Sequence, residues 1–229
     1  MTINIVWCVF FNRPGLSAAL KLSYRGLKYA YRGPSLFAGK MRGAGHDING
    51  VTCDEELTLS TFQTIGIHET ATIFYITTHG IFDTTGYRAC LNTADWFPNF
   101  SGIVGQSVVV AVFDTCFLID STLSWRNIWA STNFGTSLRL LLGFDNLAEL
   151  GRGNAWRGYA FAENLINGQT FVDAWFAAVA TNTVVSNKAI AIGIGDSQTD
   201  AQHVLSTASL AAMPAARSTA APVHLELRP

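Results

Sequence analysis

Charge is scarce in this sequence of 229 residues. Charged side chains make up 14% of the chain, well below the roughly 25% of ordinary soluble domains, whereas hydrophobic residues reach 49%. Lys and Arg are spread along the chain and the net charge is −1, so the sequence has no electrostatic footprint for a nucleic acid or an acidic lipid. We therefore expect neither partner, and we expect a strand-rich core that is buried on both faces.

Paired cysteines and long apolar runs are also missing. No Cys-x-x-Cys pair occurs, which argues against a zinc knuckle or a thioredoxin-like redox motif. Residues 1–11 are apolar but have no basic leader and no small-residue cleavage site, and no run approaches the length of a transmembrane helix. These absences predict a cytoplasmic protein with free thiols, no membrane contact and no metal site or cofactor. The cysteines are Cys8, Cys53, Cys90 and Cys116.

Two short apolar runs, residues 73–78 and 107–113, have the length and β-branched composition of buried strands. The first run is followed by His79, and the second is followed after two residues by Cys116. If the two strands are parallel neighbours, these side chains emerge together at the carboxyl edge of the sheet, where open α/β folds bind their ligands. The pattern therefore places a thiol beside an imidazole.

The remaining periodicity alternates strands with helices, which predicts a mostly parallel α/β sheet with helices on both faces and right-handed crossovers. We expect one domain over residues 1–205 and a weakly structured Ala/Ser/Pro-rich tail over 206–229, in which Val223–Leu227 can add an edge strand. The expected elements are strands at 3–11, 137–144 and 189–194; helices at 16–27, 125–129, 155–166 and 172–179; loops over 32–70, with a hairpin around Val51 and a helix between Glu55 and Ile65; and a long loop over 80–105.

A cysteine beside a histidine can perform nucleophilic catalysis. The thiolate is the attacking species, and an imidazole can take its proton and later return it to a leaving amine. The backbone amides of Gly80 and Cys116 are candidate donors to the oxyanion, with His79 as the acid/base. The structural alternatives are that the cysteine is a small buried hydrophobe and that the histidine only bonds a nearby carbonyl.

His79-Gly80 after one strand and Asp114-Thr115-Cys116 after the next resemble the motifs of the caspase-hemoglobinase group (clan CD) of cysteine peptidases. This group includes caspases, metacaspases, legumains, gingipains, clostripain-like enzymes and separases. The resemblance covers roughly residues 70–195. A "GF" strand, a "GR" turn and a "DAWF" helix are similar to the uncharacterised bacterial branch of the DUF6345 type, here at Gly143-Phe144, Gly151-Arg152 and Asp173-Ala174-Trp175-Phe176.

The resemblance implies roles for particular residues. It implies an oxyanion hole at Gly80 and Cys116, and an S1 carboxylate at Asp114 that accepts an Arg or Lys side chain of the substrate. The alternative for Asp114 is a capping or turn acid. After Cys116 the chain continues Phe117-Leu118-Ile119-Asp120, where metacaspases have His-Ser-Gly, so substrate binding on that side must differ.

The leading hypothesis is a cysteine endopeptidase that cleaves after a basic residue through a Cys116–His79 dyad, with a protein or peptide as its substrate. A catalytically silent caspase-like scaffold or partner-binding domain is the alternative, and an acyl-transfer enzyme acting on a small amide or ester is a third class. Arg217, in the expected tail, is a candidate site of self-cleavage.

Other polar residues carry weaker signals. Asp196 and Asp200 are too few carboxylates to predict a calcium site, and Gly193–Asp196 lacks the Gly-Lys-Ser/Thr of a phosphate loop. The other histidines have no ligand spacing, and we expect them on the surface or in loops. They are His46, His68, His203 and His224.

Overall fold

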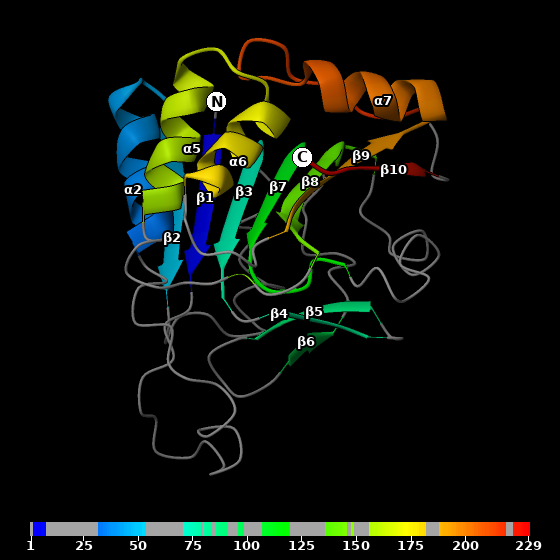
Figure 1. Cartoon of the computed structure of the whole chain (residues 1–229). Coiled ribbons are helices and arrows are strands. Elements are labelled where there is room, and N and C mark those ends of the chain that lie inside the picture. The colour runs from blue at the N-terminus through cyan, green and yellow to red at the C-terminus, as the bar shows by residue number, and fades with distance from the viewer. Residues whose placement is uncertain are drawn as a thin grey trace.

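A seven-stranded sheet forms the centre of the computed structural model (Figure 1). The structure describes residues 2–7, 32–53, 71–78, 80–83, 86–90, 96–98, 107–119, 136–145, 148, 156–181, 188–218 and 222–229. For residues 2–7, 49–53, 81–83, 86–90 and 96–98 it describes the backbone alone.

The strands of this sheet are parallel in its larger part and antiparallel at one edge. Their order is β10-β9-β8-β7-β3-β1-β2. Each neighbouring pair from β2 to β8 is parallel, whereas β9 runs antiparallel to β8 and β10 antiparallel to β9. The mostly parallel sheet predicted from the sequence is thereby confirmed. The strands are β1 (Thr2–Trp7), β2 (Asp47–Cys53), β3 (Ile73–Thr77), β7 (Val110–Asp114), β8 (Leu140–Phe144), β9 (Ala189–Gly195) and β10 (Val223–Leu227).

A second, three-stranded antiparallel sheet lies beyond the carboxyl ends of the parallel strands (Figure 1). Its strands are β4 (Gly80–Asp83), β5 (Gly86–Cys90) and β6 (Trp96–Pro98). The long loop expected over residues 80–105 is therefore wrong where these strands lie. Short strands are stabilised mainly by pairing with one another, which the local composition does not reveal.

The described helices pack with the sheet around one apolar core. They are α2 (Arg32–Gly43), α5 (Arg157–Ile166), α6 (Phe171–Ala180) and α7 (Gln198–Thr207). Figure 1 shows α2, α5 and α6 side by side on one face of the sheet, and α7 beside β9 and β10. Aromatic rings fill the space between helices and sheet: Phe37, Tyr75, Phe144, Phe161 and Trp175, all fully buried.

The opposite face of the sheet is buried as well. Phe74, Phe113, Leu141 and Ile192 alternate with the residues of the helix-facing side and have no exposed surface. Strands buried on both faces need continuous apolar runs, which is why the sequence pattern marked them so clearly. The α/β class inferred from that pattern is confirmed.

Helix α2 is absent from the expectation for residues 32–70, where the glycines and proline were interpreted as loop signals. Pro34 lies in the first turn of α2, where its missing N–H costs no helical hydrogen bond. The backbone of Gly33 lies close to α5 because Gly158 has no side chain: a Cβ atom on Gly158 would lie 2.0 Å from the Gly33 oxygen. Strand β2 also differs from the expected hairpin around Val51, because it pairs in parallel with β1. The helix expected between Glu55 and Ile65 lies outside the described residues, as do those at 16–27 and 125–129.

Local capping signals define the later helices. Helix α5 ends before Gly168, which has a φ of 87°, as its Asn-Gly sequence predicted. Thr170 caps α6 by accepting the Asp173 N–H at 3.1 Å. Ser197 likewise accepts the Asp200 N–H at 3.1 Å and begins α7, a helix that the sequence analysis missed.

The C-terminal segment is part of the main body rather than a weakly structured tail. The Ala208 carbonyl accepts the N–H of Phe171 at 2.8 Å. The buried guanidinium of Arg139 donates to the carbonyl of Ala215. Strand β10 then pairs with β9, which confirms the edge strand expected at these residues.

Candidate functional site

Strands β3 and β7 are parallel neighbours, as the sequence hypothesis required. In their register Thr77 lies opposite Asp114. His79 lies two residues after Thr77 in the sequence, and Cys116 lies two residues after Asp114. His79 itself lies outside the described residues. Gly80, the first residue of β4, is partly buried.

Cys116 is a free, partly buried thiol at the carboxyl edge of the sheet. The N–H of Ala148 donates to Sγ of Cys116 at 3.3 Å, and the thiol donates to the Ala148 carbonyl at 3.7 Å. Burial raises the pKa of the Cys116 thiol, and this effect outweighs the opposing hydrogen bond from Ala148. The described surroundings of Cys116 therefore favour the neutral thiol, and a thiolate there needs a cationic neighbour.

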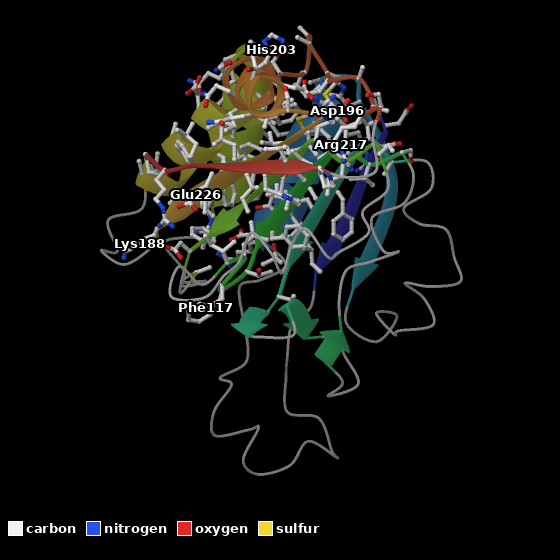
Figure 2. The ribbon with its side chains drawn as sticks, turned by 90° about the vertical axis from the view of Figure 1, so that its right-hand side faces the viewer. Phe117, Lys188, Asp196, His203, Arg217 and Glu226 are labelled. Atoms are coloured by element: carbon white, nitrogen blue, oxygen red, sulfur yellow. The ribbon has the colours of Figure 1, made fainter. Side chains whose placement is uncertain are left out.

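The residue after the cysteine has an unusual backbone. Phe117 has a φ of 52°, and it is the one residue other than glycine among those described with a positive φ. This left-handed conformation costs a residue with a Cβ atom about 1 kcal/mol. The next residue is anchored, because the N–H of Leu118 donates to the carbonyl of Phe144 at 2.8 Å. Figure 2 shows Phe117 at the end of the main sheet that faces the small sheet.

Asp114, the predicted S1 carboxylate, is buried inside the fold with an internal cation. Its side chain is 1% exposed and its Oδ1 lies 2.5 Å from Nη2 of Arg157, whose side chain is 0% exposed. The Tyr75 hydroxyl donates to Oδ2 at 3.0 Å. Burial raises the pKa of Tyr75 well above its ordinary value, so the phenol stays a hydrogen-bond donor. Asp114 is thus the last residue of β7 and part of a buried ion pair, which differs from the capping or turn acid considered as the alternative; the S1 role stays a prediction.

Sequence reasoning missed Arg157 and Tyr75. A signal for Arg157 existed, because residues 157, 161 and 165 share the buried face of α5 and only the first of them is charged. A charged residue on an otherwise apolar helix face needs a buried partner. Tyr75 gave no comparable signal, since aromatic residues are common in strands.

A separate polar network lies at the other end of the sheet, near α7. The two carboxylate oxygens of Asp200 each accept from Nη2 of Arg139, at 2.7 and 2.8 Å. The same carboxylate also accepts the N–H of Asp196. Asp196 accepts the N–H and hydroxyl of Ser218, at 2.8 and 2.7 Å. These carboxylates therefore serve ion pairing and capping, and no group of three metal ligands occurs in the part of the chain that is described.

Two expectations about this region are corrected. Arg217 is only 6% exposed and its N–H donates to the Thr136 carbonyl at 2.8 Å, so it is not in a flexible segment. His224 is 8% exposed, rather than on the surface, and lies in β10. His203 is exposed on α7 and His46 is partly exposed, whereas His68 lies outside the described residues.

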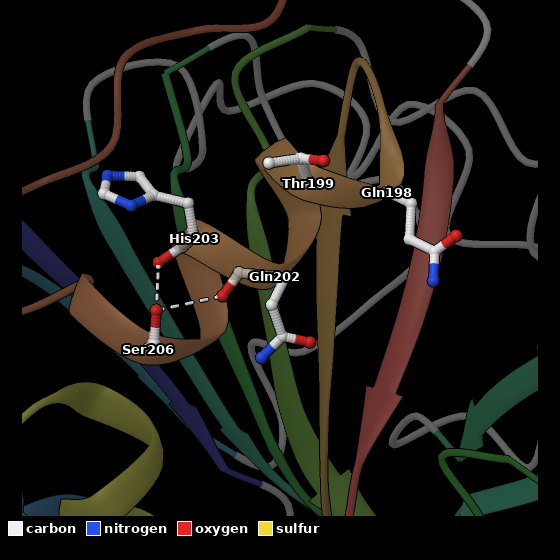
Figure 3. Close-up of a pocket in the computed structure, with 5 residues that line it drawn as sticks. All are labelled: Gln198, Thr199, Gln202, His203 and Ser206. Carbon is white, nitrogen blue, oxygen red and sulfur yellow. Dashed lines mark hydrogen bonds between the residues drawn. The ribbon is translucent and has the colours of Figure 1, made fainter.

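Neither of two depressions in the described surface is lined by Cys116. One, of about 470 Å³, lies over the exposed face of α7 (Figure 3). It is lined by Gln198, Thr199, Gln202, His203 and Ser206. Helix α7 lies away from the small sheet, which marks the carboxyl edge of the parallel strands (Figure 1). None of the described helices is long and apolar enough to cross a membrane.

Comparison with known proteins gives a structural match without a sequence match. No family model matches the chain, and no curated protein matches it either, so the resemblance to the DUF6345-type branch stays a prediction. Among 13 matching chains of known structure is the initiator caspase Dronc of Drosophila. Its crystal structure matches with a TM-score of 0.50 and 10% identity, over 81% of this chain and 74% of that chain. The chain therefore has a caspase-like α/β fold.

Proposed function

We propose that this protein is a cysteine endopeptidase in which Cys116 is the nucleophile and His79 the general acid/base. The observation that carries the proposal is the register of β3 and β7. Thr77 is paired with Asp114 at the carboxyl edge of the sheet, and His79 and Cys116 each follow two residues after one member of this pair. The caspase-like fold supports the same reading, although a match at 10% identity concerns the fold alone.

The proposed reaction begins when His79 takes the thiol proton of Cys116. The thiolate then attacks the carbonyl carbon of the substrate, and the amides of Gly80 and Cys116 stabilise the oxyanion. The C–N bond breaks as His79 gives the proton to the leaving amine, which leaves a thioester on Cys116. A water molecule, deprotonated by His79, hydrolyses this thioester and restores the thiol.

Any preference for Arg or Lys before the scissile bond depends on Asp114, and the internal ion pair of Asp114 with Arg157 limits its size. Asp114 lies two positions before Cys116, and the resemblance to clan CD peptidases implies that a carboxylate at this position lines the S1 pocket. A carboxylate shielded from water binds a guanidinium strongly through paired hydrogen bonds.

A peptidyl-arginine acyloxymethylketone tests the assignment. The thiolate displaces the carboxylate leaving group and forms a thioether, so the protein gains the mass of the inhibitor without that group. We expect one adduct on Cys116 in the wild type, none in Cys116→Ala, and labelling at least tenfold slower in His79→Ala. Labelling of Cys116 at the same rate in the wild type and His79→Ala would overturn the dyad.

One observation favours a catalytically silent caspase-like domain instead. Burial raises the pKa of Cys116, and its sulfur both accepts from and donates to the backbone of Ala148. Thiols in such surroundings are unreactive. Alkylation by iodoacetamide at neutral pH separates the two functions, because a dyad thiolate reacts faster than the free thiol of cysteine and a silent thiol reacts more slowly.

A further inference from the structure

Asp114 and Arg157 form an ion pair that is almost completely removed from water. Their side chains are 1% and 0% exposed, and Nη2 of Arg157 lies 2.5 Å from Oδ1 of Asp114. A buried carboxylate is stable only if a cation or several hydrogen bonds compensate its charge. In this fold the compensation comes from Arg157 and from the Tyr75 hydroxyl, 3.0 Å from Oδ2.

Arg157 is the first residue of α5, and its side chain extends from there to the carboxylate of Asp114. Gly158 allows this approach, because a Cβ atom at that position would lie 2.0 Å from the Gly33 oxygen. The Arg157 guanidinium also lies 4.8 Å from the centre of the Phe144 ring. The residue just before it, Trp156, is 60% exposed, whereas Arg157 has no exposed surface.

We propose that Arg157 determines the substrate specificity of this site. Its guanidinium already binds the carboxylate of Asp114, to which a basic side chain of the substrate would otherwise bind. The inference rests on the proposed peptidase function. A basic substrate then reaches Asp114 only by exchange for Arg157, whereas a neutral substrate leaves the internal ion pair intact.

The need to displace Arg157 from Asp114 determines how strongly the site prefers a basic residue of the substrate. Binding of a substrate guanidinium to a free carboxylate gains a charge-assisted interaction, which corresponds to about 10- to 100-fold in rate or affinity. When Arg157 must leave first, one guanidinium replaces another and most of that gain is lost. The wild type therefore discriminates poorly between arginine and an uncharged side chain of the same shape.

Matched probes measure this discrimination. Two peptidyl acyloxymethylketones that differ only in arginine or citrulline at the reacting end have the same shape, and only the first is charged. We expect their rates of Cys116 labelling to differ less than about threefold in the wild type. In Arg157→Met the arginine-to-citrulline ratio rises at least tenfold, and in the double variant Asp114→Asn/Arg157→Met it returns to the wild-type value. An unchanged ratio in Arg157→Met overturns the proposal.

A second measurement covers the case in which Arg157→Met is too unstable for labelling. We expect millimolar methylguanidinium, and not the uncharged methylurea, to raise the melting temperature of Arg157→Met by several degrees while leaving the double variant unchanged. Equal responses of the two variants overturn the proposal.

The two hypotheses fail in different ways. If neither probe labels wild-type Cys116, the peptidase function fails, and the specificity role of Arg157 falls with it. If both probes label wild-type Cys116 but the ratio does not change in Arg157→Met, only the role of Arg157 fails. If methylguanidinium stabilises Arg157→Met but the labelling ratio stays constant, the carboxylate is accessible without contributing to specificity, which also overturns the proposal.

Discussion

Thr77 and Asp114 lie opposite each other in the parallel ladder between β3 and β7. This pairing fixes the register of the two strands at the carboxyl edge of the sheet. Asp114 is held from the helix side by Arg157, whereas Cys116, two residues later, contacts the backbone of Ala148. The strand end thus combines a buried, charge-balanced ion pair with a partly buried thiol just beyond it.

The pH dependence of Cys116 alkylation is expected to shift when His79 is replaced. Burial alone raises the pKa of this thiol, so an imidazolium neighbour is needed to lower it. In His79→Ala the inflection of the alkylation rate should therefore move to higher pH, and the rate at pH 7 should fall about tenfold for each unit of that shift. Peptide mass mapping distinguishes Cys116 from the other thiols, and coincident profiles would contradict the prediction.

Gly158→Ala is expected to be strongly destabilising. The added Cβ atom would lie 2.0 Å from the Gly33 oxygen, so α5 must move away from α2, at a cost of about 3 kcal/mol in the free energy of unfolding. Gly39→Ala is the matched control in an exposed part of α2, with nothing within 4 Å of the new methyl group. It should stabilise the protein by about 0.5–1 kcal/mol. Urea unfolding measures both, and a similar effect of the two variants would contradict the close contact.

Arg139→Met is expected to release the C-terminal segment. Arg139 is buried and binds Asp200, the Ile194 carbonyl at 2.9 Å and the Ala215 carbonyl. Its loss should destabilise the protein by about 3 kcal/mol, because Asp200 and the carbonyls lose their donor. The readout is limited trypsin digestion followed by mass spectrometry.

Cleavage after Arg217 should be slow in the wild type, where this side chain is buried, and at least tenfold faster in Arg139→Met. Asp200→Asn is the control, because it removes the negative charge but keeps one acceptor oxygen for Arg139. It should produce a smaller increase. Rapid cleavage of the wild type at Arg217 would show that the segment is not held as described.

Stability is expected to fall below neutral pH because of His224. Burial, aided by the charge of Arg217, lowers the pKa of His224 from 6.5 to about 4. The unfolded chain therefore binds a proton first, and the contribution of this residue is present above pH 6.5 and lost as the pH falls toward 4. Between pH 7 and pH 5 the loss amounts to about 2 kcal/mol.

The His224→Leu variant isolates this contribution. Because leucine binds no proton, the variant should lose about 2 kcal/mol less than the wild type between pH 7 and pH 5, as measured by urea unfolding at both pH values. Equal losses in the two proteins would contradict the assignment to His224.

Sequence patterns predicted the parts of the fold whose signal is local. Continuous apolar runs mark β3, β7 and β9 because both faces of these strands are buried. Helix α6 was predicted by its apolar spacing, and an Asn-Gly pair marked the end of α5. Helix α7 was missed, although Ser197 and Asp200 form a capping signal, because only three of its ten residues are apolar: Ala201, Val204 and Leu205.

Glycine and proline were misleading where tertiary contacts determine their role. In α2 they were interpreted as loop signals, yet Pro34 lies in the first turn of the helix and the Gly33 backbone packs against Gly158 of α5. Likewise, residues 208–218 have no pattern of their own and are held by contacts with residues far away in the sequence, Arg139 among them.

The sequence by itself determined the α/β class, the strands that carry His79 and Cys116, and the edge strand β10, because each depends on the hydrophobic pattern of a few consecutive residues. Only the tertiary structure decided that Thr77 pairs with Asp114, that β9 is antiparallel to β8, and that Arg157 neutralises Asp114. These features depend on which segments meet in space. The free energy of a buried charge is set by the partner that meets it, and no local pattern specifies that partner.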